Sequence, residues 1–140
     1  LRMQRIYFSA YQRGVGDASL DSDPTKSSDP TQAFVREHRL YQVDFLLRKY
    51  GFKDADIVFD PRGRLSLDAD PKEVWARNHP EVFPLDVNRA SRLELLRVPG
   101  LGPLTVDRIV SQRATRRIRG LEDIGRVGAR LAKARSYLMF

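Results

Sequence analysis

The segment Leu95-Leu96-Arg97-Val98-Pro99-Gly100-Leu101-Gly102-Pro103 decides how this chain is organised. An apolar run leads into a turn made of glycine and proline, and a second amphipathic run follows over residues 104–110. This order predicts two helices joined by a tight hairpin. The glycines permit positive φ and let another molecule approach the main chain closely. Pro103 suits the first turn of the second helix, whose free N–H groups and dipole favour an anion such as phosphate.

The positive charge of the chain is concentrated in the part that holds this hairpin. The 140 residues carry 25 Lys and Arg against 18 Asp and Glu, a net charge of +7. Residues 1–83 hold 13 of each, so the whole excess lies in residues 84–140, with 12 cations and 5 anions. Eleven of those cations are Arg, whose planar guanidinium suits phosphate. Binding to a polyanion is the favoured interpretation, and a basic surface that only aids solubility is the alternative.

The composition excludes several kinds of functional site within these residues. The chain contains no cysteine, so it has no disulfide, thiolate-bound metal, iron–sulfur cluster or cysteine nucleophile of its own. Its two histidines, His38 and His79, lie 41 positions apart and belong to no metal or nucleophile motif. We therefore expect a binding module and not an enzyme, with no metal bound by side chains. The lack of cysteine, of a signal-peptide pattern and of a membrane-spanning apolar run fits a cytoplasmic protein.

Residues 1–33 are expected to form an N-terminal strand and a flexible linker. Residues 5–11 are rich in aromatic and β-branched side chains, which predicts a short strand. A lone strand is unstable, so we expect its partner strands to precede Leu1. Residues 14–32 consist mainly of Gly, Ser, Asp, Pro and Thr and include two Asp-Pro steps, which start turns and disfavour helix.

Residues 34–83 are expected to be a helical bridging segment. Residues 34–50 place apolar side chains at helical spacing, and Gly51 is a C-cap signal. The expected stripe comprises Phe34, Leu40, Val43, Leu46, Leu47 and Tyr50. A second helix is predicted to start at Asp70-Pro71-Lys72-Glu73, with an acidic N-cap, proline at the first position and a capping box. That helix carries Trp75, which we interpret as a core residue and not as a base-stacking one.

Residues 84–140 contain the hairpin and a weak repeat of it. The first helix is expected to open at Ser91, with Glu94 completing a capping box. Its inward side chains are expected to be Leu93, Leu96 and Val98, opposite Val106, Ile109 and Val110. Residues 95–102 align with residues 121–128 at an offset of 26 positions, although Arg126 replaces the first hairpin glycine. We therefore interpret the second copy as degenerate.

The hairpin resembles the helix-hairpin-helix motif of DNA-binding and repair proteins. That motif reads apolar-x-Gly-apolar-Gly and is matched here by Val98, Gly100, Leu101 and Gly102. The resemblance implies a mainly α fold class, in which a tandem helix-hairpin-helix domain at the C-terminus follows a short strand, a long loop and two helices. Paired motifs of this kind pack about a pseudo-two-fold axis. The second copy is either structural only, or its Arg126, Arg130 and Lys133 contact the other DNA strand.

The same resemblance implies how the motif binds double-stranded DNA. Backbone N–H groups of the turn point at one phosphate, the hydroxyl of Thr105 adds a hydrogen bond, and nearby arginines supply charge. Such contacts carry little sequence information, so we expect non-sequence-specific binding across the minor groove that salt weakens. The expected DNA-binding residues are Gly100, Leu101, Gly102, Leu104, Thr105, Arg108, Arg113, Arg116, Arg117, Arg119, Arg126, Gly128 and Arg130.

Two details of the motif concern its cations. Many family members place lysine directly after Gly-x-Gly-Pro, where this chain has Leu104, and Arg108 is the expected substitute. Family hairpins also often hold a monovalent cation on carbonyl oxygens. The matching carbonyls are those of Leu96, Val98 and Leu101.

Most of the chain also resembles the C-terminal part of the DNA modification/repair radical SAM protein family. The matching segments include Arg36-Glu37-His38-Arg39-Leu40-Tyr41-Gln42, Leu46-Leu47-Arg48-Lys49-Tyr50-Gly51-Phe52 and Phe83-Pro84-Leu85-Asp86-Val87-Asn88-Arg89-Ala90. The resemblance implies an upstream barrel with a cysteine-bound [4Fe–4S] cluster that cleaves S-adenosylmethionine, and a partner resembling uracil-DNA glycosylases. This chain would then be the part that delivers DNA. The alternative is a protein–protein interaction domain that uses the helix-hairpin-helix as a packing element.

Overall fold

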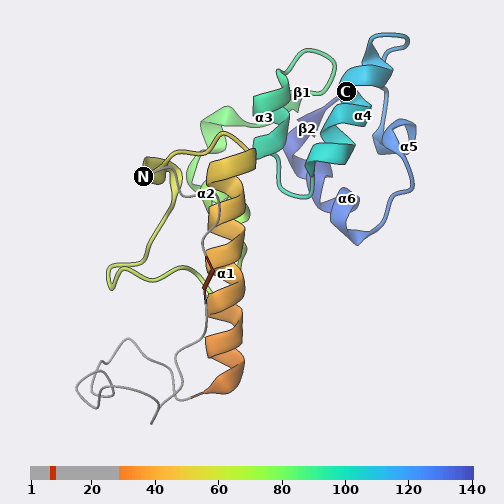
Figure 1. Cartoon of the computed structure of the whole chain (residues 1–140). Coiled ribbons are helices and arrows are strands. Elements are labelled where there is room, and N and C mark those ends of the chain that lie inside the picture. The colour runs from red at the N-terminus through yellow and green to blue at the C-terminus, as the bar shows by residue number, and fades with distance from the viewer. Residues whose placement is uncertain (1–6, 9–28) are drawn as a thin grey trace, which may run out of the picture. The chain divides into compact units, whose positions relative to one another are not determined.

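Helices dominate the part of the chain that the structure describes. A computed structural model gives residues 7–8 and 29–140 (Figure 1). Within these residues there are six α-helices and one parallel sheet of two short strands, so the expected mainly α fold class is confirmed. The chain divides into two units, Leu1–Pro71 and Lys72–Phe140.

The first unit contains one long helix, α1 (Pro30–Lys49). Its N-cap is Asp29, whose side chain accepts a hydrogen bond of 2.9 Å from the backbone N–H of Thr31, and proline occupies the first helical position. The helix therefore starts four residues earlier than predicted. The step Asp29-Pro30, which we expected to be a turn in a linker, is a helix start because the same residue types serve both purposes.

The apolar stripe predicted for α1 is only partly buried. Leu46 and Tyr50 are 5% and 7% exposed, but Phe34, Leu40 and Leu47 are 70%, 38% and 40% exposed. The prediction was wrong for these three side chains because helical spacing does not say how far along the helix its packing partners extend. The nearly buried Asp44 is paired with the guanidinium of Arg48 one turn later, with an Nε–Oδ1 distance of 2.9 Å.

Only Tyr7 and Phe8 of the expected N-terminal strand are described, and neither belongs to a strand. The hydroxyl of Tyr41 on α1 accepts a hydrogen bond from the Phe8 N–H at 3.1 Å and donates one to the Phe8 carbonyl at 2.8 Å. Their rings meet edge to face at 5.3 Å. The rest of the expected strand, and the expected linker before Asp29, lie outside the described residues.

Loops complete the first unit after α1. A short 3₁₀ helix, η2 (Asp54–Asp56), is followed by a turn at Asp60, whose carboxylate accepts hydrogen bonds from the N–H groups of Arg64 and Arg62. These bonds hold the pKa of Asp60 below its ordinary value. The guanidinium of Arg39 donates to the Ser66 carbonyl at 3.2 Å and thereby fastens the later loop to α1.

The helix α2 (Pro71–Asn78) lies in the second unit except for its first residue, and it starts where the sequence predicted. Trp75 on this helix is 3% exposed, so its interpretation as a core residue is confirmed. Its indole stacks on the ring of His79 at 4.4 Å, and the guanidinium of Arg97 lies 4.5 Å from the indole centre. A 3₁₀ helix, η3 (Pro80–Val82), follows.

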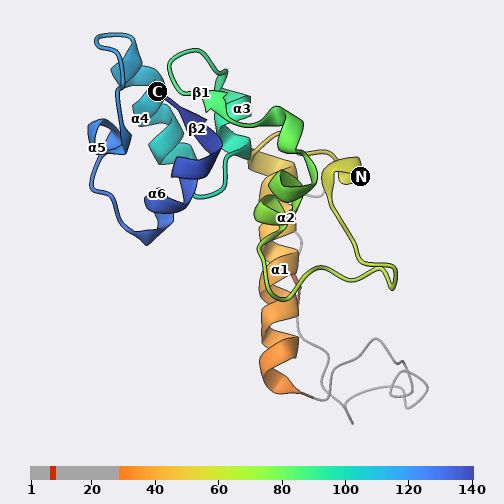
Figure 2. The ribbon, with the colours of Figure 1, turned by 180° about the vertical axis from the view of Figure 1, so that it is seen from behind.

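Four helices and two strands form the rest of the second unit (Figure 2). They are β1 (Leu85–Asp86), α3 (Arg92–Arg97), α4 (Pro103–Arg113), α5 (Leu121–Ile124), α6 (Ala129–Lys133) with the 3₁₀ turn η4 (Ala134–Tyr137), and β2 (Leu138–Met139). β1 and β2 pair in parallel, with Leu85 opposite Leu138. This pairing, which the sequence did not predict, joins the segment before α3 to the segment after η4.

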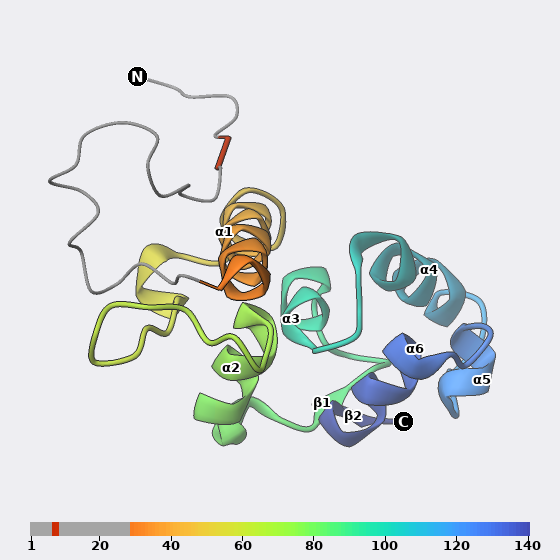
Figure 3. The ribbon, with the colours of Figure 1, turned by 90° about the horizontal axis from the view of Figure 1, so that it is seen from below.

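The core of the second unit lies between these helices. α3 packs on α4, and α4 packs on α5, and the three helices follow one another in the view from below (Figure 3). The side chains at most 1% exposed include Val87, Leu95, Leu96, Val98, Leu101, Val106, Ile109, Ile118, Leu121, Ile124 and Ala134. Leu93, which we expected to face inward, is 57% exposed, and Leu95 takes its place. Val110 is half-buried.

Candidate nucleic-acid interface

The first hairpin has the backbone that its sequence predicts. Ser91 caps α3 and exchanges two hydrogen bonds with Glu94, which confirms the capping box. The turn is closed by a hydrogen bond of 3.1 Å from the Leu101 N–H to the Val98 carbonyl, and Gly100 adopts a positive φ of 89°. Gly102 is the N-cap of α4, and Pro103 is its first residue.

The start of α4 offers backbone donors that no side chain caps. Gly102 has no side chain to accept their hydrogen bonds, and the first turn contains no acidic residue. N–H groups in a first helical turn have no partner within the helix, and the helix dipole favours a negative charge there. Leu104 at this turn is 83% exposed, so the apolar residue in the usual lysine position projects into solvent.

The second copy packs closely against the first at Gly100. A Cβ atom built on Gly100 would fall against the carbonyl oxygen of Arg130 and lie 3.2 Å from the backbone nitrogen of Ala134. The backbone of α6 and η4 therefore passes directly over this glycine. Its lack of a side chain is required for packing within the unit, independently of any bound molecule.

The second copy has the same plan with a different turn. Leu121 and Ile124 are buried like Leu95 and Val98, and Gly128 caps α6 with φ −91° and ψ 175°, close to the −108° and 172° of Gly102. The positive φ has moved to Gly125, at 156°, and Arg126 occupies the aligned position of Gly100. Val127 is 38% exposed, whereas Leu101 is 1% exposed. The second turn is thus open to solvent where the first is packed.

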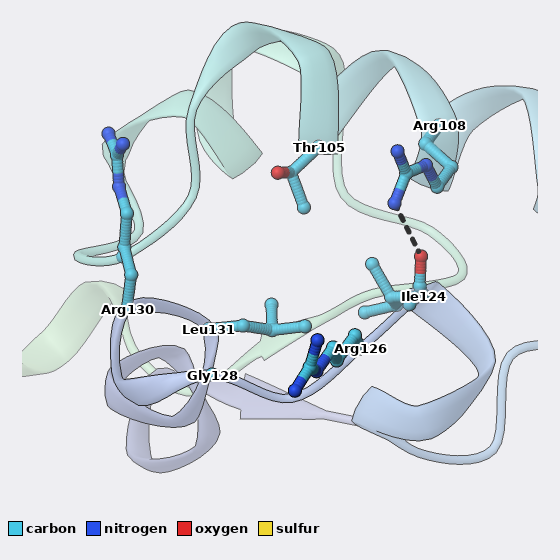
Figure 4. A pocket seen from close by; sticks show the side chains of 9 residues that line it. Thr105, Arg108, Ile124, Arg126, Gly128, Arg130 and Leu131 are labelled. Carbon is cyan, nitrogen blue, oxygen red and sulfur yellow. Dashed lines mark hydrogen bonds between the residues drawn. The ribbon is translucent and has the colours of Figure 1, made fainter.

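A cavity of about 220 Å³ lies between the two hairpins (Figure 4). It is lined by Gly100, Thr105, Arg108, Ile124, Gly125, Arg126, Gly128, Arg130 and Leu131. Six of the expected DNA-binding residues are therefore brought together around it: Gly100, Thr105, Arg108, Arg126, Gly128 and Arg130. The guanidinium of Arg108 donates to the Ile124 carbonyl at 3.3 Å, so one arginine of the first copy is fixed at the edge of the second.

The expected arginines outside the cavity differ in their surroundings. Arg113 is half-buried and donates to the carbonyls of Val87, at 3.0 Å, and Ala90, at 2.6 Å. It holds the loop between β1 and α3. Arg116, Arg117 and Arg119 are exposed on the connector between the two copies. The guanidinium of Arg116 lies 3.8 Å from the carboxylate of Asp123.

Lys72 on α2 contacts the hairpin, and the sequence did not predict this contact. It is 8% exposed, and its ammonium group donates a hydrogen bond of 2.5 Å to the carbonyl of Leu101. That carbonyl is one of the three expected to hold a monovalent cation. The structure therefore places a positive charge of the protein itself on the hairpin. Only the burial of Lys72 at a helix start, which sequence alone does not show, could have indicated this contact.

Two more contacts of the unit were not predicted. The side-chain amide of Asn88 donates to the Ile118 carbonyl and accepts from the Ile118 N–H, both at 2.9 Å, and thereby ties the loop before α3 to the connector. The ammonium of Lys133 donates to Glu73 at 2.6 Å, and this bond lowers the pKa of Glu73. Lys133, which we considered as a contact to the second DNA strand, is therefore paired within the unit.

Residues 7–8 and 29–140 contain neither a metal site nor a membrane-spanning helix. No group of three or more His, Asp or Glu side chains there is arranged to hold a metal ion. No helix in this part is both long and apolar enough to cross a membrane.

No protein-family model, curated protein or solved structure matches the chain.

Proposed function

We propose that the second unit is a tandem helix-hairpin-helix domain that binds double-stranded DNA without sequence specificity. One observation carries the proposal: α4 begins with an uncapped first turn beside a cavity lined by Arg108, Arg126 and Arg130. Backbone donors at a helix start and guanidinium groups both bind phosphate oxygens. Their combination at one surface suits the regularly charged backbone of a duplex.

The kind of contact sets the kind of specificity. Contacts to phosphate position a protein on the duplex but do not read its bases. Each phosphate that is neutralised releases counterions, so the affinity falls steeply as salt is added. The charge distribution supports the same function, because residues 84–140 carry the entire net charge of +7. Arg117 and Arg119 on the exposed connector extend the basic surface beyond the cavity.

We propose further that this unit delivers DNA to a catalytic part of a DNA modification/repair radical SAM protein. The ordered sequence resemblance in residues 36–90 supports this role. The residues of this chain do not fit the iron–sulfur cluster of that family, because no cysteine is present to bind it. The cluster, S-adenosylmethionine and a partner resembling uracil-DNA glycosylases would belong to other parts of the assembly.

The proposal is tested by titrating a fluorescein-labelled duplex with the 140-residue chain and measuring anisotropy at two salt concentrations. We expect binding to several unrelated sequences with similar affinity, and a loss of affinity between about 50 and 200 mM salt. The double variant Arg126→Gln/Arg130→Gln should bind more weakly than the charge-matched control Arg89→Gln/Arg135→Gln, whose side chains are 88% and 64% exposed outside the cavity. Equal losses in the two variants would refute the role of the cavity arginines.

A protein–protein interaction domain is the second candidate, and exposed apolar side chains favour it. Phe34 and Phe45 on α1 are 70% and 45% exposed, and Leu104 at the hairpin is 83% exposed. In a docked complex these side chains would be removed from water. This function predicts no duplex affinity at physiological salt, so the same titration separates the two candidates.

A further inference from the structure

The cavity between the two hairpins has only positive charge among its lining side chains. Arg108, Arg126 and Arg130 line it, and no lining residue is acidic. Within the described residues, Arg126 and Arg130 are exposed and form no ion pair with a carboxylate. Guanidinium groups that line one cavity without a counter-charge repel one another, and an anion bound there relieves that repulsion. The composition of the cavity therefore points to an anionic ligand.

The size of the cavity limits what that anion can be. Its volume of about 220 Å³ lies below the range of roughly 300–1,000 Å³ that holds drug-sized ligands. A water molecule takes a share of about 30 Å³ in the liquid, so the space is large enough for a phosphate group. The ligand is thus a small anion or the end of a larger one.

Two other lining residues suit a phosphate group. The hydroxyl of Thr105 lies on the wall formed by the first copy (Figure 4). On the opposite wall, a Cβ atom built on Gly128 would meet no atom within 4 Å, so the space in front of this glycine is open. Arg108 is held in place by the Ile124 carbonyl, which leaves its remaining N–H groups as directed donors.

We propose that this cavity binds the terminal phosphomonoester of a DNA strand, such as the 5′ phosphate at a nick, gap or end. The proposal rests on the duplex binding proposed above and adds a preference to it. An internal phosphodiester continues into a sugar on both sides and carries one charge. A terminal phosphate continues on one side only and carries about −1.5 to −2 at pH 7, so it can enter a cavity and engage several guanidinium groups.

The test compares three DNA dumbbells of one sequence, each closed at both ends by hairpin loops. The first is continuous, the second has a nick with a 5′ hydroxyl, and the third has the same nick with a 5′ phosphate. We expect the 140-residue chain to bind the phosphorylated nick about tenfold more tightly than the hydroxyl nick, as for an added charge-assisted hydrogen bond. The preference should shrink between about pH 7.5 and 5.5, because the phosphomonoester loses its second charge while arginine keeps its own.

Substitutions locate the preference in the cavity. Arg126→Gln/Arg130→Gln should bind the two nicked dumbbells with equal affinity. The control Arg89→Gln/Arg135→Gln removes the same charge from exposed positions outside the cavity and should keep the preference. Because Arg126 and Arg130 are exposed, their replacement should leave the circular dichroism spectrum unchanged. A preference that survives in the cavity variant, or that disappears equally in both variants, would overturn the proposal.

A second measurement separates this inference from the duplex function. NMR spectra are recorded with a single-stranded tetrathymidylate that carries either a 5′ phosphate or a 5′ hydroxyl. The phosphorylated form alone should shift the backbone amide signals of Thr105 and Gly128. If the chain binds every dumbbell equally and these signals do not respond, the cavity assignment fails and duplex binding stands. If these signals respond but no dumbbell binds, the duplex function fails and the cavity assignment stands.

Discussion

Replacing Gly100 by alanine tests the most specific packing contact of the structure. The new Cβ would collide with the Arg130 carbonyl and lie 3.2 Å from the Ala134 nitrogen, both of which are backbone atoms and not flexible side-chain ends. The residue would also keep the positive φ of 89°, which alanine adopts at a cost of about 1–2 kcal/mol. Overpacking adds about 1–3 kcal/mol, so we expect a total loss of about 3 kcal/mol of unfolding free energy.

Gly128→Ala is the matched control for this substitution. Gly128 has a negative φ of −91°, and a Cβ there would meet no atom within 4 Å. Its cost is limited to the poorer N-cap that alanine makes, roughly 0.5–1 kcal/mol. The two variants remove the same kind of residue from the two hairpins, so they differ in the positive φ of Gly100 and in its contact with α6 and η4.

The melting temperatures of both variants are measured by the fluorescence of Trp75 during thermal unfolding. Trp75 is the only tryptophan of the chain and lies in the second unit. For a unit of this size 1 kcal/mol corresponds to about 4–8 °C, so Gly100→Ala should melt about 12–24 °C below the native chain. Gly128→Ala should melt within about 8 °C of it. If the two variants melt together, the close approach of the second copy at Gly100 is refuted.

Three further predictions concern contacts within the second unit. Lys72→Met should lower the unfolding free energy measured with denaturant by about 2 kcal/mol, because the buried carbonyl of Leu101 loses its hydrogen-bond donor. A stability equal to that of the native chain would contradict this. Since the ammonium of Lys72 already occupies that carbonyl, the DNA affinity of the native chain should be the same in sodium and potassium chloride at equal ionic strength. The pKa of Glu73 is lowered mainly by the hydrogen bond from Lys133, so the carboxylate stabilises the folded unit at pH values above its unfolded pKa near 4.5. That stabilisation is lost as the pH falls through the lower pKa of the folded state. Glu73→Gln should therefore make the unfolding free energy less dependent on pH in this acid range. Asn88→Ala should cost about 2 kcal/mol, one for each lost hydrogen bond, and a chevron analysis that shows no change would count against it.

Local signals predicted the helix starts well. Asp70-Pro71, the Ser91–Glu94 capping box and Pro103 act within a few residues, so their physical effect can be read from adjacent positions. The start of α1 was missed for a local reason as well, because Asp29-Pro30 can open either a turn or a helix. The first turn of α1 is exposed, so burial does not explain why the helix starts there, and the Asp-Pro step alone does not distinguish the two structures.

Contacts between positions far apart in the chain could not be predicted from the sequence. The two-residue strands β1 and β2 are too short to leave a periodic pattern, and their pairing joins Leu85 to Leu138. The bond from Lys72 to Leu101 spans 29 positions and uses a lysine that would ordinarily be read as a solvated surface residue. The candidate site was therefore predictable as a set of residue types. Its cavity and the internal roles of Arg113 and Lys133 were not.

The contact at Gly100 has a consequence for which substitutions the two turns tolerate. Position 100 admits no side chain unless backbone atoms of α6 and η4 are displaced. The aligned position in the second turn carries Arg126, a long charged side chain that is exposed. A change of residue type in the first turn therefore acts on the folding of the unit, whereas a change in the second turn acts on its surface charge.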